Sequence, residues 1–183
     1  MMTVLENHEL IAKISSHGAE LHSLYDKTTK TEYIWQGDKT YWPWHAPICF
    51  PITGRVHNDE YIFEDKKYML TVHGFARDYE FSLLKKTENS VIYELIYNDE
   101  SLKVYPFKFS LQLEYVLLED GLKVNYTVKN LENENKDIFF ALGLHTAYNC
   151  PLEKTDDFED YELIFEQKET AKRHFLTNGI INN

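Results

Sequence analysis

The residues most able to do chemistry lie between Trp42 and Phe81, where an arginine follows a glycine and a histidine precedes one. Gly54 stands before Arg55, and a glycine there lets the backbone come close to whatever the guanidinium binds. Further on, His73 stands before Gly74, and a histidine can give or take a proton near neutral pH. The combination predicts a binding site rather than a purely structural wall.

Three prolines determine how the chain must run to position these groups. Pro43, Pro47 and Pro51 fall four residues apart, so a helix interior is excluded and a continuous strand ladder would lack three donors. We therefore expect an extended, kinked segment that carries the apolar residues 48–52 into the core and delivers Arg55 at its end.

Two short strand-type runs, 61–63 and 67–70, follow around a turn at 65–66. The resulting hairpin would bring His73 and Gly74 back toward Arg55.

The bulk composition excludes several classes of function. A chain of 183 residues with 43% hydrophobic and 27% charged residues predicts one packed domain, and the net charge of -11 argues against nucleic acid and anionic membrane as partners. Two cysteines, Cys49 and Cys150, make no disulfide framework. No targeting segment or apolar run of about 18 residues is present, so we expect a cytoplasmic protein.

Strand-type runs recur along the chain at a spacing typical of an antiparallel sandwich or barrel, and no amphipathic helix of three turns is visible. The predicted strands are 3–15 as a hairpin, 19–25, 33–35, 79–84, 90–97, 107–118, 122–130 and 161–166, and residues 138–144 form a short apolar run.

Several strings together resemble the aldose 1-epimerase (galactose mutarotase-like) superfamily, and within it the LacX-type branch. They are His45-Ala-Pro-Ile-Cys-Phe-Pro-Ile-Thr-Gly-Arg55, His73-Gly-Phe-Ala-Arg-Asp78, Tyr105-Pro-Phe-Lys-Phe109, Gly143-Leu-His145 and Asp160-Tyr-Glu-Leu-Ile-Phe165. The resemblance covers roughly residues 10–180. It implies an all-β fold, a large antiparallel β-sandwich over residues 1–183 as a single domain, whose concave sheet holds a sugar.

The implied activity is an isomerase that interconverts the α and β anomers of an aldose without a cofactor. This reaction takes a proton from the C1 hydroxyl and gives one to the ring oxygen, so it needs an acid and a base. By resemblance, His145 is the general acid and His73 a second histidine beside the reacting centre. By resemblance, Arg55 is the arginine that binds the substrate, and Arg77 is a further candidate. Among the aromatic residues, Tyr148, Phe75 and Trp44 are those considered as faces on which a sugar could stack. Thr146 departs from the family, which has a proline after the acid.

Plainer interpretations of the same residues stay open. Arg55 has a possible partner in Asp59, and Arg77 in Asp78 or Glu80. His17, His22 and His57 are read as structural histidines. No metal is expected, because the chain has no His-x-x-x-His on a helix and no Cys-x-x-Cys.

The resemblance also implies a catalytic glutamate in a C-terminal third that this chain lacks. Glu159, Glu162, Glu166 and Glu169 are available, but no motif selects one of them. Two alternatives to the epimerase therefore remain, a hexose-6-phosphate 1-epimerase and a non-catalytic carbohydrate-binding module. The expected partners are a small aldose or sugar phosphate and, through unpaired sheet edges, further copies of the chain.

Overall fold

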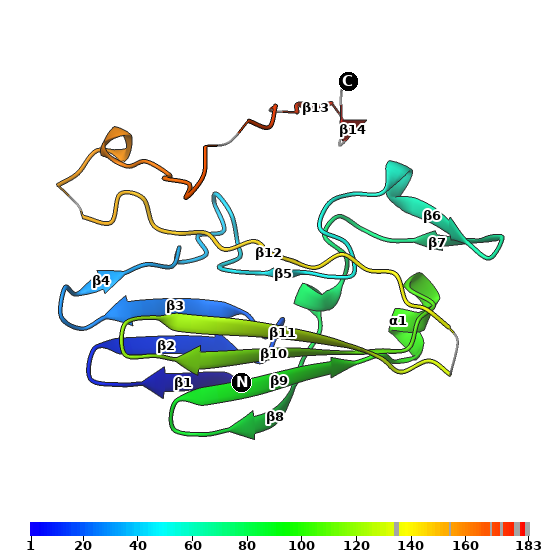
Figure 1. Cartoon of the computed structure of the whole chain (residues 1–183), viewed down its shortest axis with the longest axis horizontal. Helices are drawn as coiled ribbons and strands as arrows, with labels where there is room; N and C mark the ends of the chain where they lie inside the picture. Colours follow the sequence, from blue (N-terminus) through cyan, green and yellow to red (C-terminus); the bar gives the residue numbers. More distant parts are fainter. Residues whose placement is uncertain (134–135, 154, 169, 173, 178–179, 182–183) are drawn as a thin grey trace.

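Two four-stranded antiparallel sheets dominate the structure, a computed structural model that describes residues 1–133, 136–153, 155–168, 170–172, 174–177 and 180–181 (Figure 1). The strand orders are β1-β2-β3-β4 and β11-β10-β9-β8. The strands are β1 (Met2–Glu6), β2 (Leu10–Ser15), β3 (Leu21–Asp26), β4 (Thr31–Glu32), β5 (Ile48–Cys49), β6 (Glu60–Phe63), β7 (Lys66–Met69), β8 (Ser82–Lys86), β9 (Ser90–Ile96), β10 (Phe109–Leu117), β11 (Leu122–Asn130), β12 (Gly143–Leu144), β13 (Leu176–Thr177) and β14 (Ile180–Ile181).

The first sheet begins with the hairpin predicted from the sequence. β1 and β2 pair from Met2 opposite Ser15 to Glu6 opposite Ile11. The turn is closed by Asn7, whose Oδ1 accepts hydrogen bonds from the backbone N–H groups of Glu9 and Leu10. Side chains of β1 alternate between exposed and buried, as a strand with one face on the core requires.

The second sheet contains the longest ladder. β10 and β11 pair without a break from Phe109 opposite Asn130 to Leu117 opposite Leu122. A six-residue helix, α1 (Asp99–Val104), connects β9 to β10, and a reciprocal pair of hydrogen bonds between Asn98 and Ser101 closes its first turn. None of the helices in the described residues has the length and apolarity to span a bilayer.

The two sheets pack face to face around one apolar core. Their buried faces contribute Leu5, Ile14, Val91, Leu111 and Leu113, all fully buried. Two tyrosine hydroxyls of the second sheet reach across this core: Tyr93 hydrogen-bonds Thr3 of β1 at 2.6 Å, and Tyr115 donates to the carbonyl of Ala19, between β2 and β3, at 2.6 Å. The all-β antiparallel sandwich predicted from the sequence is confirmed.

The stretch that carries the candidate chemistry forms a separate layer on this sandwich. Figure 1 shows β5 and β12 side by side, with the β6–β7 hairpin and the last part of the chain on the side away from β8. β6 and β7 pair from Glu60 opposite Met69 to Phe63 opposite Lys66, which confirms the predicted hairpin.

Two predicted strands differ from the structure, and the apolar run 138–144 contains the short strand Gly143–Leu144. Residues 33–35 form only an isolated bridge, Ile34 with Tyr148. Residues 161–166 are not a strand, and Leu163 and Ile164 are 88% and 83% exposed. An apolar run forms a strand only where a neighbouring backbone completes its hydrogen bonds over several residues. Residues 161–166 have no such ladder among the described residues, and the backbone hydrogen bonds of Tyr33 and Trp35 extend only over the single bridge of Ile34 with Tyr148.

Candidate functional site

His145 is positioned by three neighbouring chain segments. Gly143 and Leu144 pair with Cys49 and Ile48. The ladder is then extended by backbone hydrogen bonds from His145 N–H to the Pro47 carbonyl at 3.0 Å and from Ala147 N–H to the His45 carbonyl at 2.8 Å. On the other side Trp35 N–H donates to the Ala147 carbonyl at 3.0 Å. His145 therefore lies at the end of β12 with its backbone fixed and its side chain exposed.

His73 is positioned by a tight turn around Phe50. Phe50 N–H donates to the His73 carbonyl at 3.1 Å, and the Phe50 carbonyl accepts from Phe75 and Ala76. Gly74 has φ +72°, and a Cβ on it would lie 2.1 Å from the Phe50 carbonyl oxygen, so only glycine fits here. His73 itself has φ +66°, a left-handed conformation that is uncommon outside glycine and found preferentially at functional sites.

The His73 ring is also oriented. Its Nδ1 lies 2.8 Å from the Thr53 carbonyl oxygen, and since a carbonyl only accepts, Nδ1 carries the proton. Nε2 is thus the nitrogen left to face a ligand. The backbone N–H of His73 donates to the Gly54 carbonyl at 2.8 Å, which confirms that the hairpin returns His73 to the neighbourhood of Arg55.

The two histidines meet in space. The imidazole rings of His73 and His145 lie edge to face with their centroids 5.4 Å apart. Because the residues come from distant parts of the chain, the fold itself creates the pair, and two titratable groups at this spacing can act on one small ligand.

A pocket of about 370 Å³ opens beside His145. Its lining residues are Trp35, Trp42, His145, Thr146, Ala147 and Tyr148. The Trp42 ring lies 5.2 Å from the His145 ring, and Trp35 Nε1 donates to the Trp42 carbonyl at 2.9 Å, which fixes the loop that presents Trp42. Aromatic walls of this kind suit the apolar face of a pyranose ring.

The tryptophans that line the pocket are Trp35 and Trp42, whereas the sequence had suggested Trp44. The signal was present in the string Trp42-Pro-Trp44, but the string does not tell which indole faces the pocket. In the structure it is Trp42, while Trp44 packs edge-on against Trp42 and beneath the Arg77 guanidinium, 4.9 Å from its ring centroid.

Both candidate arginines already have partners. Arg55 donates from Nε and Nη2 to the two carboxylate oxygens of Asp59, at 2.7 and 3.2 Å. Arg77 is mostly buried, donates from Nη2 to the Val72 carbonyl at 3.2 Å, and leaves Nε without a hydrogen bond among the described residues. Arg55 is thus paired with Asp59, as the plainer interpretation of the sequence expected.

The two remaining site residues have opposite environments. Phe75 is 7% exposed and packs among Phe50, Tyr105 and Phe109, so its ring belongs to the core and not to the pocket. Tyr148 is 68% exposed and lines the pocket next to His145.

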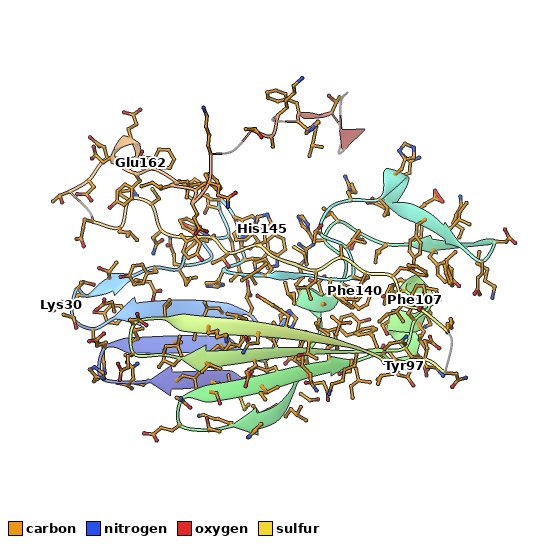
Figure 2. All side chains as sticks on the ribbon, viewed as in Figure 1. Lys30, Tyr97, Phe107, Phe140, His145 and Glu162 are labelled. Carbon is orange, nitrogen blue, oxygen red and sulfur yellow. The ribbon has the colours of Figure 1, made fainter. Side chains whose placement is uncertain are left out.

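Three of the four carboxylates considered as a base are described, and none of these three contacts His145. Glu159, Glu162 and Glu166 are exposed, and among the described residues His145 makes no hydrogen bond or ion pair with a carboxylate. Figure 2 labels both His145 and Glu162, which lie on different segments. Glu169 lies outside the described residues.

These features define a β-sandwich with a histidine pair beside an aromatic pocket. The sequence matches the family model of aldose 1-epimerase over residues 1–178, and the chain belongs to that family. It is 36% identical over 189 residues to the chromosomal LacX protein of Lactococcus lactis subsp. lactis, a match that covers 99% of this chain and 62% of that protein.

Two solved structures from lactobacilli are similar in sequence and in fold. A galactose mutarotase-like protein from Lactobacillus casei has 43% identity and a TM-score of 0.78, over 84% of this chain and 52% of that one. A galactose mutarotase related enzyme from Lactobacillus acidophilus has 38% identity and a TM-score of 0.83, over 87% of this chain and 53% of that one. The chain thus spans between half and two thirds of the length of these relatives.

Proposed function

We propose that this chain carries the acid side of an aldose 1-epimerase site, which interconverts the α and β anomers of a non-phosphorylated aldose. The observation that carries the proposal is the pairing of His73 and His145 at 5.4 Å beside the aromatic pocket. Membership of the aldose 1-epimerase family supports the reaction class.

In this proposal His145 gives a proton to the ring oxygen of the bound pyranose, and the C1–O5 bond breaks to open the ring. His73 holds a sugar hydroxyl through Nε2, since its Nδ1–H is committed to the Thr53 carbonyl. Trp42 and Tyr148 confine the ring against His145. After rotation about the C1–C2 bond, the same proton transfers run in reverse and close the other anomer.

The base that takes the C1 hydroxyl proton is the component missing from the described site. A positioned base contributes about 10²–10⁴-fold to such a rate. We therefore expect this chain alone to bind aldoses and to accelerate their anomerisation little, whereas a protein of the relatives' full length has room for a further carboxylate.

The test is exchange NMR between the anomeric protons of galactose and glucose, with and without the protein, run beside a relative of full length. Binding with exchange well below that of the relative supports the proposal. Exchange as fast as in the relative would show that a base lies within this chain, and no binding of either sugar would refute the assignment.

A carbohydrate-binding module is the second candidate, and it is favoured by the observation that no carboxylate of the described residues contacts His145. The two are distinguished by a third sample, the chain with high concentrations of formate as an external base. An epimerase site that lacks only its base regains exchange in proportion to formate, and the gain is lost in His145→Asn. A binding module shows no such gain.

Phosphorylated hexoses fit the site less well. A phosphate is held best by cations whose donors can reach it. Arg55 is paired with Asp59, Arg77 is mostly buried, and neither arginine lines the pocket beside His145. Adding glucose 6-phosphate to the same NMR experiment checks this, with weaker binding expected than for glucose.

A further inference from the structure

A cluster of one carboxylate and two imidazoles lies where β3 begins and where the chain approaches β5. Glu20, His22 and His45 each offer one ligand atom, and these atoms lie within 4.8 Å of one another. None of the three lines the pocket beside His145. Because His45 is far from the other two in sequence, no local spacing motif marks the cluster, which explains why motif analysis predicted no metal.

The Glu20 carboxylate is held in a fixed orientation. Its Oε1 accepts from the backbone N–H groups of His45 and Ala46, at 2.7 and 3.0 Å, and its Oε2 lies 3.1 Å from His22 Nε2. Burial acts to raise the pKa of Glu20, but the hydrogen bonds from His22 and from the His45 and Ala46 backbone together lower it below its ordinary value. The carboxylate is therefore ionised at neutral pH, and one of its oxygens faces the two imidazoles.

His45 supplies the second observation. Its Nδ1 is buried and has no hydrogen-bond partner within the described residues. Burial, with the neighbouring His22 acting in the same direction, lowers the pKa of His45, so its imidazole is neutral at pH 7. A buried nitrogen without a partner is costly, and a neutral imidazole nitrogen is the most common metal ligand in proteins.

The ring of His45 is also confined. Gly37 has φ +68°, and a Cβ on it would lie 2.7 Å from His45 Cε1, so a larger residue at position 37 would displace the ring. Backbone hydrogen bonds to Glu20 and close packing around His45 resemble the outer-shell contacts that orient metal ligands.

We propose that Glu20, His22 and His45 bind a divalent transition-metal ion of the Zn²⁺ type. Two imidazoles and a carboxylate are a ligand set that zinc takes, with water in the fourth position. With metal–ligand bonds of about 2.0–2.1 Å, ligand atoms of a tetrahedral site lie about 3.3 Å apart. Glu20 Oε2 and His22 Nε2 lie 3.1 Å apart in a hydrogen bond, and the ion would replace the proton between them.

Binding requires one ring to turn. The rings of His22 and His45 are stacked, 4.0 Å between centroids and inclined by 14°, so their in-plane nitrogens point along similar directions. The side chain of His22 is 28% exposed and is the one with space to rotate toward the ion. The bound ion would connect the start of β3 to the segment leading into β5, and would thereby stabilise the fold rather than take part in the sugar reaction.

The experiment is a titration of EDTA-treated protein with Zn²⁺ by calorimetry and with Co²⁺ by visible absorption, together with thermal unfolding. We expect one ion per chain, a Co²⁺ spectrum of low coordination number, and a higher Tm with Zn²⁺, since a ligand that binds only the native state stabilises it. His45→Ala and Glu20→Gln should each weaken binding by at least about tenfold.

Two controls separate this cluster from other histidines. His57→Ala removes an exposed imidazole, and His145→Asn removes one ring of the pair beside the pocket; both should bind Zn²⁺ as the parent chain does. Loss of binding in His145→Asn, or a parent chain that binds no Zn²⁺ at micromolar concentration, would overturn the proposal. Should His45→Ala fail to fold, imidazole ¹⁵N shifts in the parent chain decide: a Zn²⁺-dependent shift of His45 Nδ1 supports the site, and an unchanged one refutes it.

Discussion

The indole of Trp42 lies against the imidazole of His145, with the ring centroids 5.2 Å apart and the planes inclined by 33°. The contact gives the proposed acid an apolar wall on one side, while the His73 ring approaches it at 5.4 Å. A pyranose in this pocket would have its ring against the indole and its ring oxygen within reach of His145.

Truncation of this wall should weaken sugar binding. We expect Trp42→Ala to lower the affinity for galactose by about 0.5–1.5 kcal/mol, and Trp42→Phe to lower it less, because an aromatic face remains. Titration followed by ligand-observed NMR measures both. Phe158→Ala, which removes an exposed aromatic outside the pocket, is the control and should change nothing.

Substitution of His145 and of His73 should affect kcat and KM differently. In a preparation that epimerises galactose, His145→Asn should cut kcat by about 10²–10⁴-fold with KM little changed, as expected for a general acid. His73→Asn should impair both kcat and KM, since Nε2 of His73 holds the substrate. His57→Asn is the matched control. An unchanged kcat in folded His145→Asn would remove this residue from the mechanism.

Arg55 and Asp59 offer a test of the substrate's charge. If Arg55 leaves Asp59 to hold sugar hydroxyls, Arg55→Ala should weaken galactose and glucose 6-phosphate equally, by about 1–3 kcal/mol for a charge-assisted hydrogen bond. Stability should change by less than about 1 kcal/mol, because the ion pair is at the surface. Parallel titrations with both sugars decide, and a loss confined to the phosphate would contradict the choice of a non-phosphorylated aldose.

The turn that carries His73 depends on Gly74. Gly74→Ala places a Cβ 2.1 Å from the Phe50 carbonyl oxygen at φ +72°, so the turn must open, and we expect a loss of at least about 3 kcal/mol in the free energy of unfolding. Gly54→Ala is the matched control, since a Cβ there meets nothing within 4 Å. Urea unfolding of both variants measures the difference; equal stability would mean that the turn adjusts freely.

Acid should destabilise the fold through the Glu20 cluster in metal-free protein. The folded-state pKa of His45 lies below its ordinary value, chiefly through burial, so stability falls as the pH drops below about 6.5. The Glu20 pKa is also lowered, by hydrogen bonds that outweigh burial. Its contribution to the stability of the fold is therefore complete above about pH 4.3 and is lost as the pH falls through the pKa of the folded state.

Thermal unfolding between pH 8 and pH 3 should therefore show both losses in the parent chain. Glu20→Gln should be less stable near neutral pH and should lack the loss at the acid end. Glu88→Gln, at an exposed turn, should follow the parent curve.

Strands were predicted correctly from the sequence where the residue pattern of the strand itself determines them. The prediction was wrong where a strand depends on a neighbour that is distant in the sequence. Alternation identified β10 and β11 correctly, since the residues on the inner face of each strand are apolar, buried in β10 and partly buried in β11. The same reasoning gave 161–166 as a strand, although its backbone has no ladder in the described residues. Association of copies through sheet edges stays a prediction.

The candidate site shows the same difference between locally determined positions and contacts made by distant residues. The return of His73 toward Gly54 follows from a local hairpin, and its position was predicted. The meeting of His73 with His145, by contrast, rested on family resemblance, and no spacing encodes it. The burial of Phe75 and the pairing of Arg55 with Asp59 depend on neighbours that a one-dimensional pattern does not fix.

The pairing of β5 with β12 has a consequence for biosynthesis. β1 to β4 pair in chain order, and so do β8 to β11, so each sheet can form as its residues leave the ribosome. β5 must wait for Gly143 and Leu144, which are made after the second sheet is complete. Until then the apolar residues Ile48 and Phe50 lack their partner strand on that side, so we expect this segment to be open to chaperone binding and proteolysis until the two histidines come together.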